Sequence, residues 1–416
     1  MKKYITKTIS LLLCALVAFG VFSFSALNVG ATGNSDKSWD VNGDGKLKIL
    51  SIGNSFAADS LEFAQQLLIA KGIDAEIDYL YKGSCDINYH WQAFTGDLAS
   101  YQFRYFKRPY WYVKDPATIK DAINFRRDGG EPQKDYWDYV IFQQASPTSG
   151  VPSSYGNLES LVDGVRELVG EKPKFLWLMT WAYAEDYPNF ANEMYYKNYY
   201  NNSQETMYNG ILESVQTEVL PLNKFDGIIP AGTAIQNART SYLNYRYLQT
   251  DKDDAGNNLG TTKGYQLTRD GLHLSTLGRY LANATVIKSI TGISADELLS
   301  TFGTGRDGNR IITPVTEEEK LAVVESVNNA VANPFEITSS EYNGKTQAFG
   351  DVNGDDVIDL NDAVLAAQAD VGSATLNSKS QKAADVNGDG KVTIHDALLI
   401  ARFVEKLIDK FPADVK

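Results

Sequence analysis

The 416-residue chain contains only two cysteines and three histidines, and only one of its apolar runs is long enough to span a bilayer. That run lies near the start, where three lysines precede it and Val29, Gly30 and Ala31 follow it. Lysines, an apolar run and then small residues are typical of a secretory signal, so we expect residues 1–31 to be removed. Because no later run could cross a membrane, we expect a secreted protein with no membrane association after cleavage.

The scarcity of cysteine excludes a disulfide framework. Cys14 lies in the expected signal, so Cys85 would be the one cysteine of the secreted protein. Leu13 precedes Cys14, where a lipoprotein signal would have a small residue, and we therefore expect a released protein without a lipid anchor. Stability must then come from a hydrophobic core, with bound ions as a further source.

Basic residues are also outnumbered. Without the three lysines of the signal, 39 Lys and Arg become 36, against 52 Asp and Glu, which gives a net charge of about −16. Such a surface repels nucleic acid and suits a metal ion or a neutral ligand. The charge therefore excludes nucleic acid as a partner.

Short apolar runs alternate with helix-like stretches through most of the chain. The runs are LKILSIG, AEIDYLYKG, DYVIFQQ, KFLWLMTW and FDGIIPAG. This alternation is typical of an α/β fold with a parallel sheet flanked by helices. We expect an N-terminal segment at 32–46, an α/β domain at 47–335, a linker without periodicity at 336–349 and a small domain at 350–410.

The small domain contains a repeat. DVNGDDVIDLND at 351–362 recurs as DVNGDGKVTIHD at 385–396, which is 34 residues later. Oxygen-bearing residues at loop positions 1, 3, 5, 9 and 12, with a carbonyl at position 7, can wrap a hard cation as an EF-hand loop does. Two matching loops favour calcium binding over a pair of acidic turns. The predicted ligands are Asp351, Asn353, Asp355, Val357, Asp359, Asp362, Asp385, Asn387, Asp389, Lys391, Thr393 and Asp396.

Each loop leads into an apolar helical stretch, AVLAAQADVG or ALLIARFVEKL, and neither has a convincing helix before it. This duplication of loop and helix, with Asp at position 12, resembles the type I dockerin, a small all-α calcium-binding domain. The resemblance implies two bound calcium ions and docking to a cohesin module of a scaffold protein in a cellulosome. It places the cohesin contacts at loop positions 10 and 11, which are Leu360, Asn361, Ile394 and His395.

Two departures from the calcium-loop pattern have consequences. Asp356 stands at position 6 of the first loop, where a sharp turn favours glycine, so we expect the first site to be the weaker one. A third stretch, DVNGDGKLKILS at 40–51, matches only up to position 6, because Lys48 and Ser51 occupy positions 9 and 12. These two residues count against calcium there, although the sequence leaves the question open.

The first apolar run ends abruptly at Gly53-Asn54-Ser55 and is followed by a helix-like stretch. Small residues at this place suit a tight strand-to-helix turn. They also suit a serine nucleophile at the tip of a sheet, where an oxyanion can be stabilised. Such a serine needs a general base, and histidine is the usual one.

His273 is the best candidate for the base. His395 belongs to a predicted calcium loop, and His90 has no obvious orienting acid near it in the sequence. His273 follows Asp270 by three residues, so that one turn would let Asp270 accept the Nδ1 proton and leave Nε2 facing Ser55. Alone, an Asp-x-x-His sequence is more often a surface turn. Together with the serine on the first strand, it predicts a catalytic unit.

A nucleophile on the first strand and Asp-x-x-His at the end resemble the SGNH (GDSL-type) hydrolases over residues 47–335. An α/β-hydrolase fits less well, because its nucleophile follows several strands. The Gly-Asp-Ser of the SGNH family is Gly53-Asn54-Ser55 here, so the middle residue departs. The resemblance implies an oxyanion hole formed by the amides of Ser55 and Gly83 and the side chain of Gln143 or Gln144. Ordinary turn and strand-end chemistry is the alternative for these donors.

Aromatic residues crowd segments 101–113 and 181–200. Aromatic rings stack on the C–H faces of sugars, although such clusters are more often packed in a core. Trp181, at the end of an expected strand, is the predicted sugar-binding residue.

The sequence thus predicts a cellulosome-associated serine esterase that removes O-acetyl groups from plant cell wall polysaccharide without a catalytic cofactor. Two alternatives stay open. One is a non-catalytic carbohydrate-binding or scaffold-linked module, and the other is an esterase or lipase for non-sugar substrates.

Overall fold

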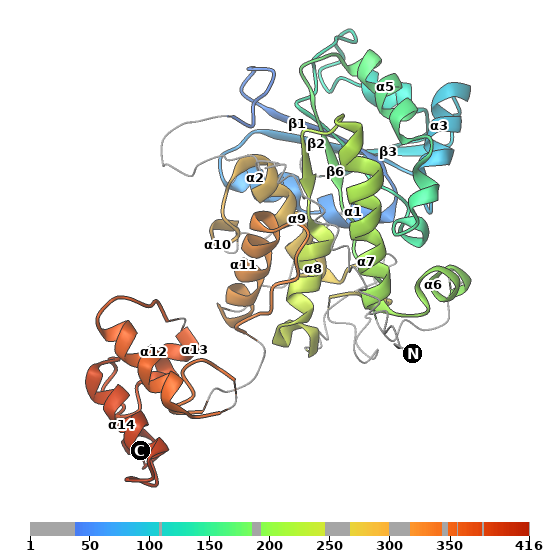
Figure 1. Cartoon of the computed structure of the whole chain (residues 1–416). Helices are drawn as coiled ribbons and strands as arrows, with labels where there is room; N and C mark the ends of the chain where they lie inside the picture. The colour runs from blue at the N-terminus through green and yellow to red at the C-terminus, as the bar shows by residue number, and fades with distance from the viewer. Residues whose placement is uncertain are drawn as a thin grey trace, which may run out of the picture.

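The computed structural model describes most of the chain after the expected signal (Figure 1). The described residues are 38–107, 110–184, 193–245, 267–298, 317–342, 348–355, 357–376 and 378–415. Two separate hydrophobic cores lie within them, one in a large α/β domain and one in a small helical domain. The expected signal at 1–31 lies outside the described residues. Among the described residues, no helix has both the length and the apolarity needed to cross a membrane.

The large domain is built on a seven-stranded sheet with strand order β4-β3-β2-β1-β5-β6-β7. Five strands are parallel, and they are the five predicted apolar runs: β1 (Leu47–Gly53), β2 (Ala75–Tyr81), β5 (Tyr139–Phe142), β6 (Lys174–Leu178) and β7 (Gly227–Ile229). The sheet is not wholly parallel, however. β3 (Tyr101–Lys107) and β4 (Tyr110–Ala117) form an antiparallel hairpin on β2, so one of the two aromatic-rich segments is a pair of strands.

Helices flank the sheet. Every residue of β1 is buried, as expected for a strand covered on both faces. One packed group contains α1 (Ser55–Leu61), α2 (Ala64–Ala70), α8 (Ala231–Arg239), α9 (Thr276–Thr291), α10 (Ala295–Leu298) and α11 (Glu317–Ala332). A second group contains α3 (Ile87–Gly96), α4 (Ile119–Asn124) and α5 (Leu158–Val169), while α6 (Glu193–Tyr200) packs on α7 (Gln204–Ser214). Short helical turns are η1 (Ser146–Thr148), η2 (Pro152–Tyr155), η3 (Val215–Val219), η4 (Leu220–Leu222), η5 (Tyr242–Tyr245) and η6 (Pro412–Val415).

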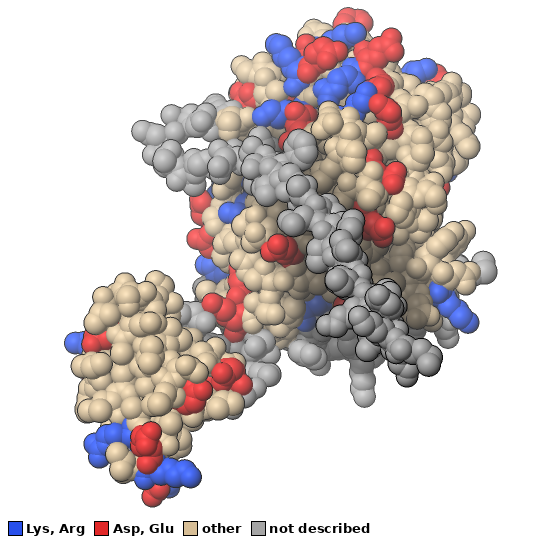
Figure 2. All heavy atoms as spheres, in the orientation of Figure 1, with Lys and Arg blue, Asp and Glu red and all other residues tan. Residues whose placement is uncertain are grey.

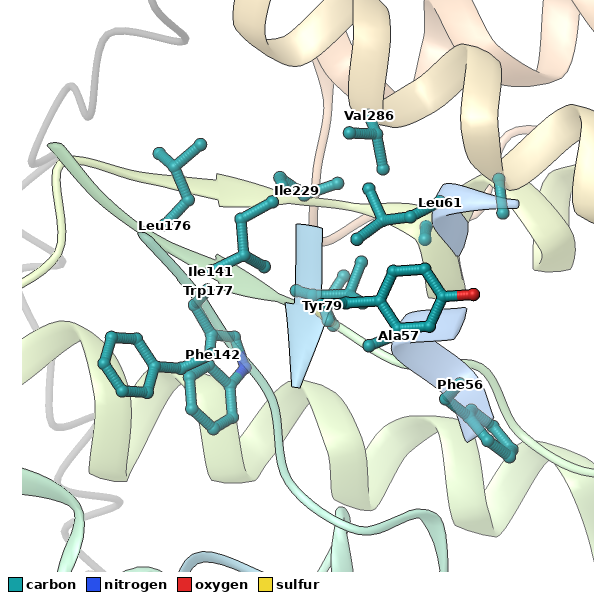
Figure 3. Close-up of a cluster of buried hydrophobic side chains, with 14 of the residues drawn as sticks. Phe56, Ala57, Leu61, Tyr79, Ile141, Phe142, Leu176, Trp177, Ile229 and Val286 are labelled. Atoms are coloured by element: carbon teal, nitrogen blue, oxygen red, sulfur yellow. The ribbon is translucent and has the colours of Figure 1, made fainter. Parts of the chain in front are cut away.

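Adjacent strand residues supply the two faces of the core (Figure 3). Ile141 and Leu176 point towards Leu61 of α1 and Val286 of α9, whereas the residues that follow them, Phe142 and Trp177, point to the opposite face. This is the alternation that a strand imposes. The helices that carry Leu61 and Val286 thus share one face of the sheet, a point that matters for the site below.

The small domain contains α12 (Leu360–Asp370), α13 (Ser378–Ala384) and α14 (Ile394–Val404). α12 and α14 pack together over a core that includes Val352, Ala366, Val386, Ile400 and Phe411. The sequence predicted no helix before either loop, and this was wrong for the second loop, because α13 ends immediately before Asp385. The buried apolar residues in the described part of α13 are Ala383 and Ala384, and two adjacent alanines give no helical periodicity in the sequence.

The predicted linker is in part attached to the large domain. Thr338 and Ser340 donate backbone hydrogen bonds to the side chains of Asn237 and Thr240, at 2.8 and 2.7 Å. Tyr342 accepts one from the Tyr242 amide at 2.7 Å. The segment up to residue 342 therefore packs with the α/β domain.

Candidate active site

Ser55 is the first residue of α1, directly after β1. Asn54 caps the helix, because its Oδ1 accepts a hydrogen bond from the Phe56 amide at 3.0 Å. A side chain at Gly53 would place Cβ only 2.8 Å from the Cβ of Ala57, so this sharp turn requires glycine. The turn leaves Ser55 half-buried, with its hydroxyl accessible to a partner from another part of the chain.

That partner is His273. The Nε2 atom of His273 lies 2.9 Å from the Ser55 Oγ, and its Nδ1 lies 2.6 Å from the Oδ2 of Asp270. Asp270 Oδ1 also accepts hydrogen bonds from the amides of Leu272 and His273, at 3.0 and 2.7 Å. The structure thus brings together the three residues predicted as a catalytic unit, in the order Asp270, His273, Ser55, across 218 residues of sequence.

The turn that carries His273 has a defined shape. Thr268 and Leu274 form an antiparallel bridge, and the Arg269 amide donates to the His273 carbonyl at 2.8 Å. Gly271, at the tip, has a φ of +91°, which favours glycine. The sequence Arg-Asp-Gly-Leu-His therefore forms a tight turn that aims the imidazole at α1.

The charge of Asp270 fits an orienting role. Burial alone would raise the pKa of Asp270, but the hydrogen bonds from His273 and from two amides outweigh it and hold the pKa below its ordinary value. Asp270 is therefore ionised at neutral pH and accepts the Nδ1 proton of His273. The side chains of His273 and Asp270 stay 25% and 31% exposed, so solvent or a ligand can reach the unit.

Gln144 does not serve as an oxyanion donor in this arrangement. Its Oε1 accepts from the amides of Ile87 and Ala145, at 3.0 and 2.8 Å, and its Nε2 donates to the carbonyl and hydroxyl oxygens of Ser154. The side chain thus holds together the loop that follows β5. The prediction that either glutamine could donate is corrected on this point, since Gln144 is fully engaged.

Gln143 lies beside the serine turn. Its Nε2 donates to Asn54 Oδ1 at 2.7 Å and to the Gln144 carbonyl at 3.3 Å, while its Oε1 is buried without a hydrogen-bond partner among the described residues. Asn54 in turn donates from Nδ2 to the Cys85 carbonyl at 3.2 Å. Of the two glutamines, Gln143 is the one that contacts the serine turn.

Trp181 is not a sugar platform. It has no exposed surface, its ring stacks on Phe56 with centroids 4.2 Å apart, and its Nε1 donates to the Leu272 carbonyl at 2.7 Å. It therefore packs between the residue after Ser55 and the turn that carries His273. In a sheet covered on both faces, a large aromatic residue at a strand end points into the core, which explains why this prediction was wrong.

The other aromatic residues of segment 181–200 divide by helix face, although residues 185–192 lie outside the described part. Tyr196 and Tyr200 of α6 are buried. Tyr195 and Tyr199 are 41% and 47% exposed, and their rings are nearly parallel with centroids 6.0 Å apart. An exposed aromatic pair thus exists on α6, at residues other than the predicted one.

Comparison with known proteins assigns both domains. Residues 48–298 match a family model described as "Domain of unknown function (DUF4886)", which is more than half of the chain. The chain belongs to the DUF4886 family. It is 30% identical to a DUF4886 family protein from Bacteroides uniformis with a crystal structure, and the alignment covers 71% of this chain and 98% of that one with a TM-score of 0.56. Residues 349–405 match the type I dockerin domain, and no curated protein matches the chain.

The dockerin of this DUF4886 protein is a calcium-binding module that implies a cohesin partner and an extracellular, cellulosome-type association. Its two loops close in the same way around the acid at position 12. Asp396 accepts from the amides of Asn387 and Thr393, and Asp362 accepts from those of Asn353 and Asp359. These acids, with the other oxygen-bearing loop residues, form a donor set suited to calcium. In the described residues, however, no three acidic, histidine or cysteine side chains converge as a metal cluster. Asp356 lies outside those residues, so the predicted weakness of the first site is not tested.

The third look-alike loop, which leads into β1, has the same hydrogen bonds as the second dockerin loop. Asp40 accepts from the amides of Asp44 and Gly45, as Asp385 does from Asp389 and Gly390. Asp138, which precedes β5, takes the place that Asp396 has in the second dockerin loop. It accepts hydrogen bonds from the amides of Asn42 and Lys48, at loop positions 3 and 9, at 2.9 and 2.7 Å. Burial, and the charges of Asp40 and Asp44, raise the pKa of Asp138 to about 6.

This loop also has a positive charge of its own. The Lys48 ammonium pairs with Asp44, the acid at loop position 5, and lies 4.2 Å from the centroid of the Tyr136 ring. In the second dockerin loop, position 9 is Thr393, which carries no charge. The sequence could show the lysine but not that it reaches back into the loop.

The predicted cohesin-binding residues are exposed. Leu360 and Ile394 are 51% and 61% exposed, and Asn361 and His395 are exposed beside them. The sequence reasoning missed Val364 and Leu398, which lie one helical turn further along α12 and α14 and are 54% and 55% exposed. Apolar residues at the same place in both repeats were the available signal. Figure 2 shows the dockerin with a largely uncharged surface on the side in view, which suits a protein partner.

Proposed function

We propose that the DUF4886 domain is a serine esterase of the SGNH type. The observation that carries the proposal is the continuous hydrogen-bonded chain from Asp270 through His273 to Ser55, with distances of 2.6 and 2.9 Å. A serine hydroxyl is a weak nucleophile until a base removes its proton, and an imidazole oriented by an acid is the arrangement that does so.

In the proposed reaction the Ser55 Oγ attacks the ester carbonyl carbon while His273 Nε2 takes the hydroxyl proton. The tetrahedral intermediate collapses, the C–O bond to the alcohol breaks, and His273 gives its proton to the departing alcohol oxygen. Water then attacks the acyl-Ser55 ester with His273 as base, which releases the acid and regenerates the hydroxyl. Asp270 stays ionised throughout and holds the imidazole.

The oxyanion would be bound by the amides of Ser55 and Gly83. Neither amide donates a hydrogen bond within the described part of the chain, and the Ser55 amide lies in the first turn of α1, where no intrahelical acceptor exists. Gln143, predicted as a third donor, already donates from Nε2 to Asn54 Oδ1 and to the Gln144 carbonyl, so its side chain would hold the serine turn in place instead. The Lys82 amide donates to the Gly53 carbonyl at 3.1 Å, which holds the Gly83 segment against the serine turn. One such donor typically contributes about 100- to 1,000-fold in kcat.

We propose O-acetyl groups on plant cell wall polysaccharide as the substrate. The dockerin supports this assignment, because it implies docking to a scaffold that carries other enzymes. Acetyl needs only a shallow pocket beside Ser55, while contacts with the sugar chain outside the pocket would position the ester. The exposed rings of Tyr195 and Tyr199 are an aromatic surface on which a sugar ring could stack.

For the rest of the protein we propose two calcium ions, one per dockerin loop, and secretion directed by residues 1–31. The cohesin would contact Leu360, Asn361, Ile394 and His395, together with Val364 and Leu398. The six residues occupy equivalent positions in the two repeats, three in each, and all six are exposed, which supports a shared role in binding.

The esterase proposal is tested with 4-nitrophenyl acetate and with acetylated xylan, pectin and mannan. Ser55→Ala and His273→Ala should each lower kcat by several orders of magnitude with the fold intact. Ser60→Ala is the matched control, since it removes from the same helix a hydroxyl that lacks a hydrogen-bond partner among the described residues. Near-normal turnover by either active-site variant would refute the mechanism, and an inactive wild type would favour a non-catalytic carbohydrate-binding module. A preference for octanoate over acetate esters would instead indicate a lipase.

A further inference from the structure

Asp59 lies one helical turn after Ser55 on α1 and is only 3% exposed. Its carboxylate receives hydrogen bonds from three different residues. Oδ2 accepts from the Leu274 amide at 2.8 Å, Oδ1 accepts from Arg279 Nε at 2.8 Å, and both oxygens lie 3.2 Å from Arg269 Nη1. This is an unusual concentration of donors on one buried acid beside the proposed nucleophile.

Two of these donors flank the turn that carries the base. Arg269 directly precedes Asp270, and Leu274 directly follows His273. Arg269 also closes the turn on itself, since its Nη1 donates to the Leu274 carbonyl at 2.5 Å. A single carboxylate on α1 therefore holds both ends of the turn against the helix that carries Ser55.

The third donor extends this connection to α9. Arg279 lies on α9, and Asn283, one turn later, donates from Nδ2 to the Asp59 carbonyl at 2.9 Å. Asn283 Oδ1 accepts from the Phe63 amide at 2.9 Å, at the junction of α1 and α2. The helix with the nucleophile and the helix after the base are thus joined by buried hydrogen bonds.

Asp59 is charged in this environment. Burial alone would raise the pKa of Asp59, but the charges of Arg269, Arg279 and His273 and the Leu274 amide outweigh it and lower the pKa. Removal of the carboxylate would leave two guanidinium groups buried without their shared acid, which is costly. A loss of activity after truncation could therefore reflect stability alone, and the test must separate the two.

We infer that Asp59 is a positioning residue for the proposed esterase reaction, which sets the contact between Ser55 and His273 by fixing residues 269–274 to α1. The inference rests on the proposed function. A misplacement of about 1 Å at a reacting pair can cost about 100-fold in rate. Asp59 forms no hydrogen bond with Ser55 or His273 among the described residues, so it would act on the pair through the turn and through the field of its charge at His273.

The test uses the full-length protein with Asp59→Asn, which keeps the shape of the side chain and removes its charge. Asp78→Asn is the control for the loss of a buried carboxyl group paired with an arginine, Arg127. Asp78 lies on β2 outside the turn, and burial raises its pKa to about 7, so this variant is compared at a pH above 8, where Asp78 is ionised. Melting temperature, kcat and KM for 4-nitrophenyl acetate, and the rate of Ser55 labelling by a fluorophosphonate probe are measured for each. Assays are run well below the melting temperature.

Asp59→Asn should lower kcat and the labelling rate by about 10- to 100-fold, with KM within about twofold of the wild type. Asp78→Asn should leave kcat unchanged, even if it lowers the melting temperature. If Asp59→Asn does not fold, Arg269→Lys keeps a cation beside Asp59 and loses the contact that closes the turn, and it should show a smaller loss of the same kind. A folded variant with wild-type kcat and labelling would overturn the inference. A wild type that is neither active nor labelled would instead refute the esterase proposal itself.

Discussion

Replacement of Asn54 by aspartate tests why this chain has an asparagine between Gly53 and Ser55. Asn54 is 3% exposed and uses both ends of its amide. Its oxygen accepts from the Phe56 amide and from Gln143 Nε2, at 3.0 and 2.7 Å, and its nitrogen donates to the Cys85 carbonyl at 3.2 Å. An aspartate can reproduce the first two contacts but not the third.

The cost follows from these contacts. Asn54→Asp would place an anionic oxygen beside the Cys85 carbonyl, in a buried site, and leave that carbonyl without its donor. A buried polar group left without its partner costs about 1–3 kcal/mol, and a stronger charged cap on the Phe56 amide would return about 0.3–1 kcal/mol. We expect a net loss of about 1–2 kcal/mol, which corresponds to a fall of about 2–8 °C in melting temperature for a domain of this size.

The loss should depend on pH. A protonated aspartic acid could donate its O–H to the Cys85 carbonyl, so burial and this contact raise the pKa of the introduced group above its unfolded value. The variant is then closest to the wild type at low pH and falls behind as pH rises through the folded pKa. Melting temperatures of both proteins between pH 4 and 8 measure this. A variant as stable as the wild type at pH 8 would show that donation to Cys85 is not the reason for asparagine, while Asn54→Ala, which loses all three contacts, should be the least stable of the set.

Three further outcomes are expected. Asp270→Asn should lower kcat on 4-nitrophenyl acetate less than His273→Ala, because the imidazole remains, and equal losses of kcat in the two variants would contradict the assigned roles. The stability deficit of Asp270→Asn relative to the wild type should be complete above the ordinary pKa of an unfolded aspartate, about 3.9, and should be lost as pH falls through the lower folded pKa of Asp270. A calcium chelator should unfold residues 350–410 and leave aryl acetate turnover intact, and proteolysis and activity are measured on one sample. If the protection of residues 350–410 from the protease does not change with calcium, the loops are not ion sites. Leu398→Asp should weaken binding to a type I cohesin at least tenfold without loss of helicity, because it puts a charge among the exposed apolar residues of α12 and α14. Calorimetry measures the affinity, and an affinity equal to that of the wild type would place the interface elsewhere.

The strands and the Ser55-His273-Asp270 unit were predictable because their signals are local. A parallel strand buried on both faces is an uninterrupted apolar run, and all five runs became strands. Asp270 and His273 lie on one tight turn, so their spacing alone indicated the contact. The contact with Ser55 was predicted from the place of Ser55 directly after the first strand and of His273 just before a late helix of the same domain.

Side-chain orientation was harder to predict. Trp181 was expected in the cleft and is buried, since sequence does not distinguish the two sides of a strand that is covered on both faces. Gln143 and Gln144 are adjacent and chemically identical, and their roles differ because Ser154, in a short helical turn after β5, binds only the second. Asp59 looks like any polar residue of a short helix until Arg269 and Arg279, more than 200 residues away, are placed beside it.

The loop at residues 40–46 has a consequence for how the protein responds to its surroundings. The cation that pairs with Asp44 is the side chain of Lys48, which is part of β1. Because it is covalently attached, its effective concentration at Asp44 does not depend on the ions in the surrounding medium. The dockerin loops, in contrast, exchange their ions with the medium and lose them when free calcium falls. A drop in calcium would therefore release the protein from a scaffold, while β1, which ends two residues before Ser55, stays anchored through Asp138. Attachment of the protein to its scaffold would be reversible, and the released protein would keep an intact proposed active site.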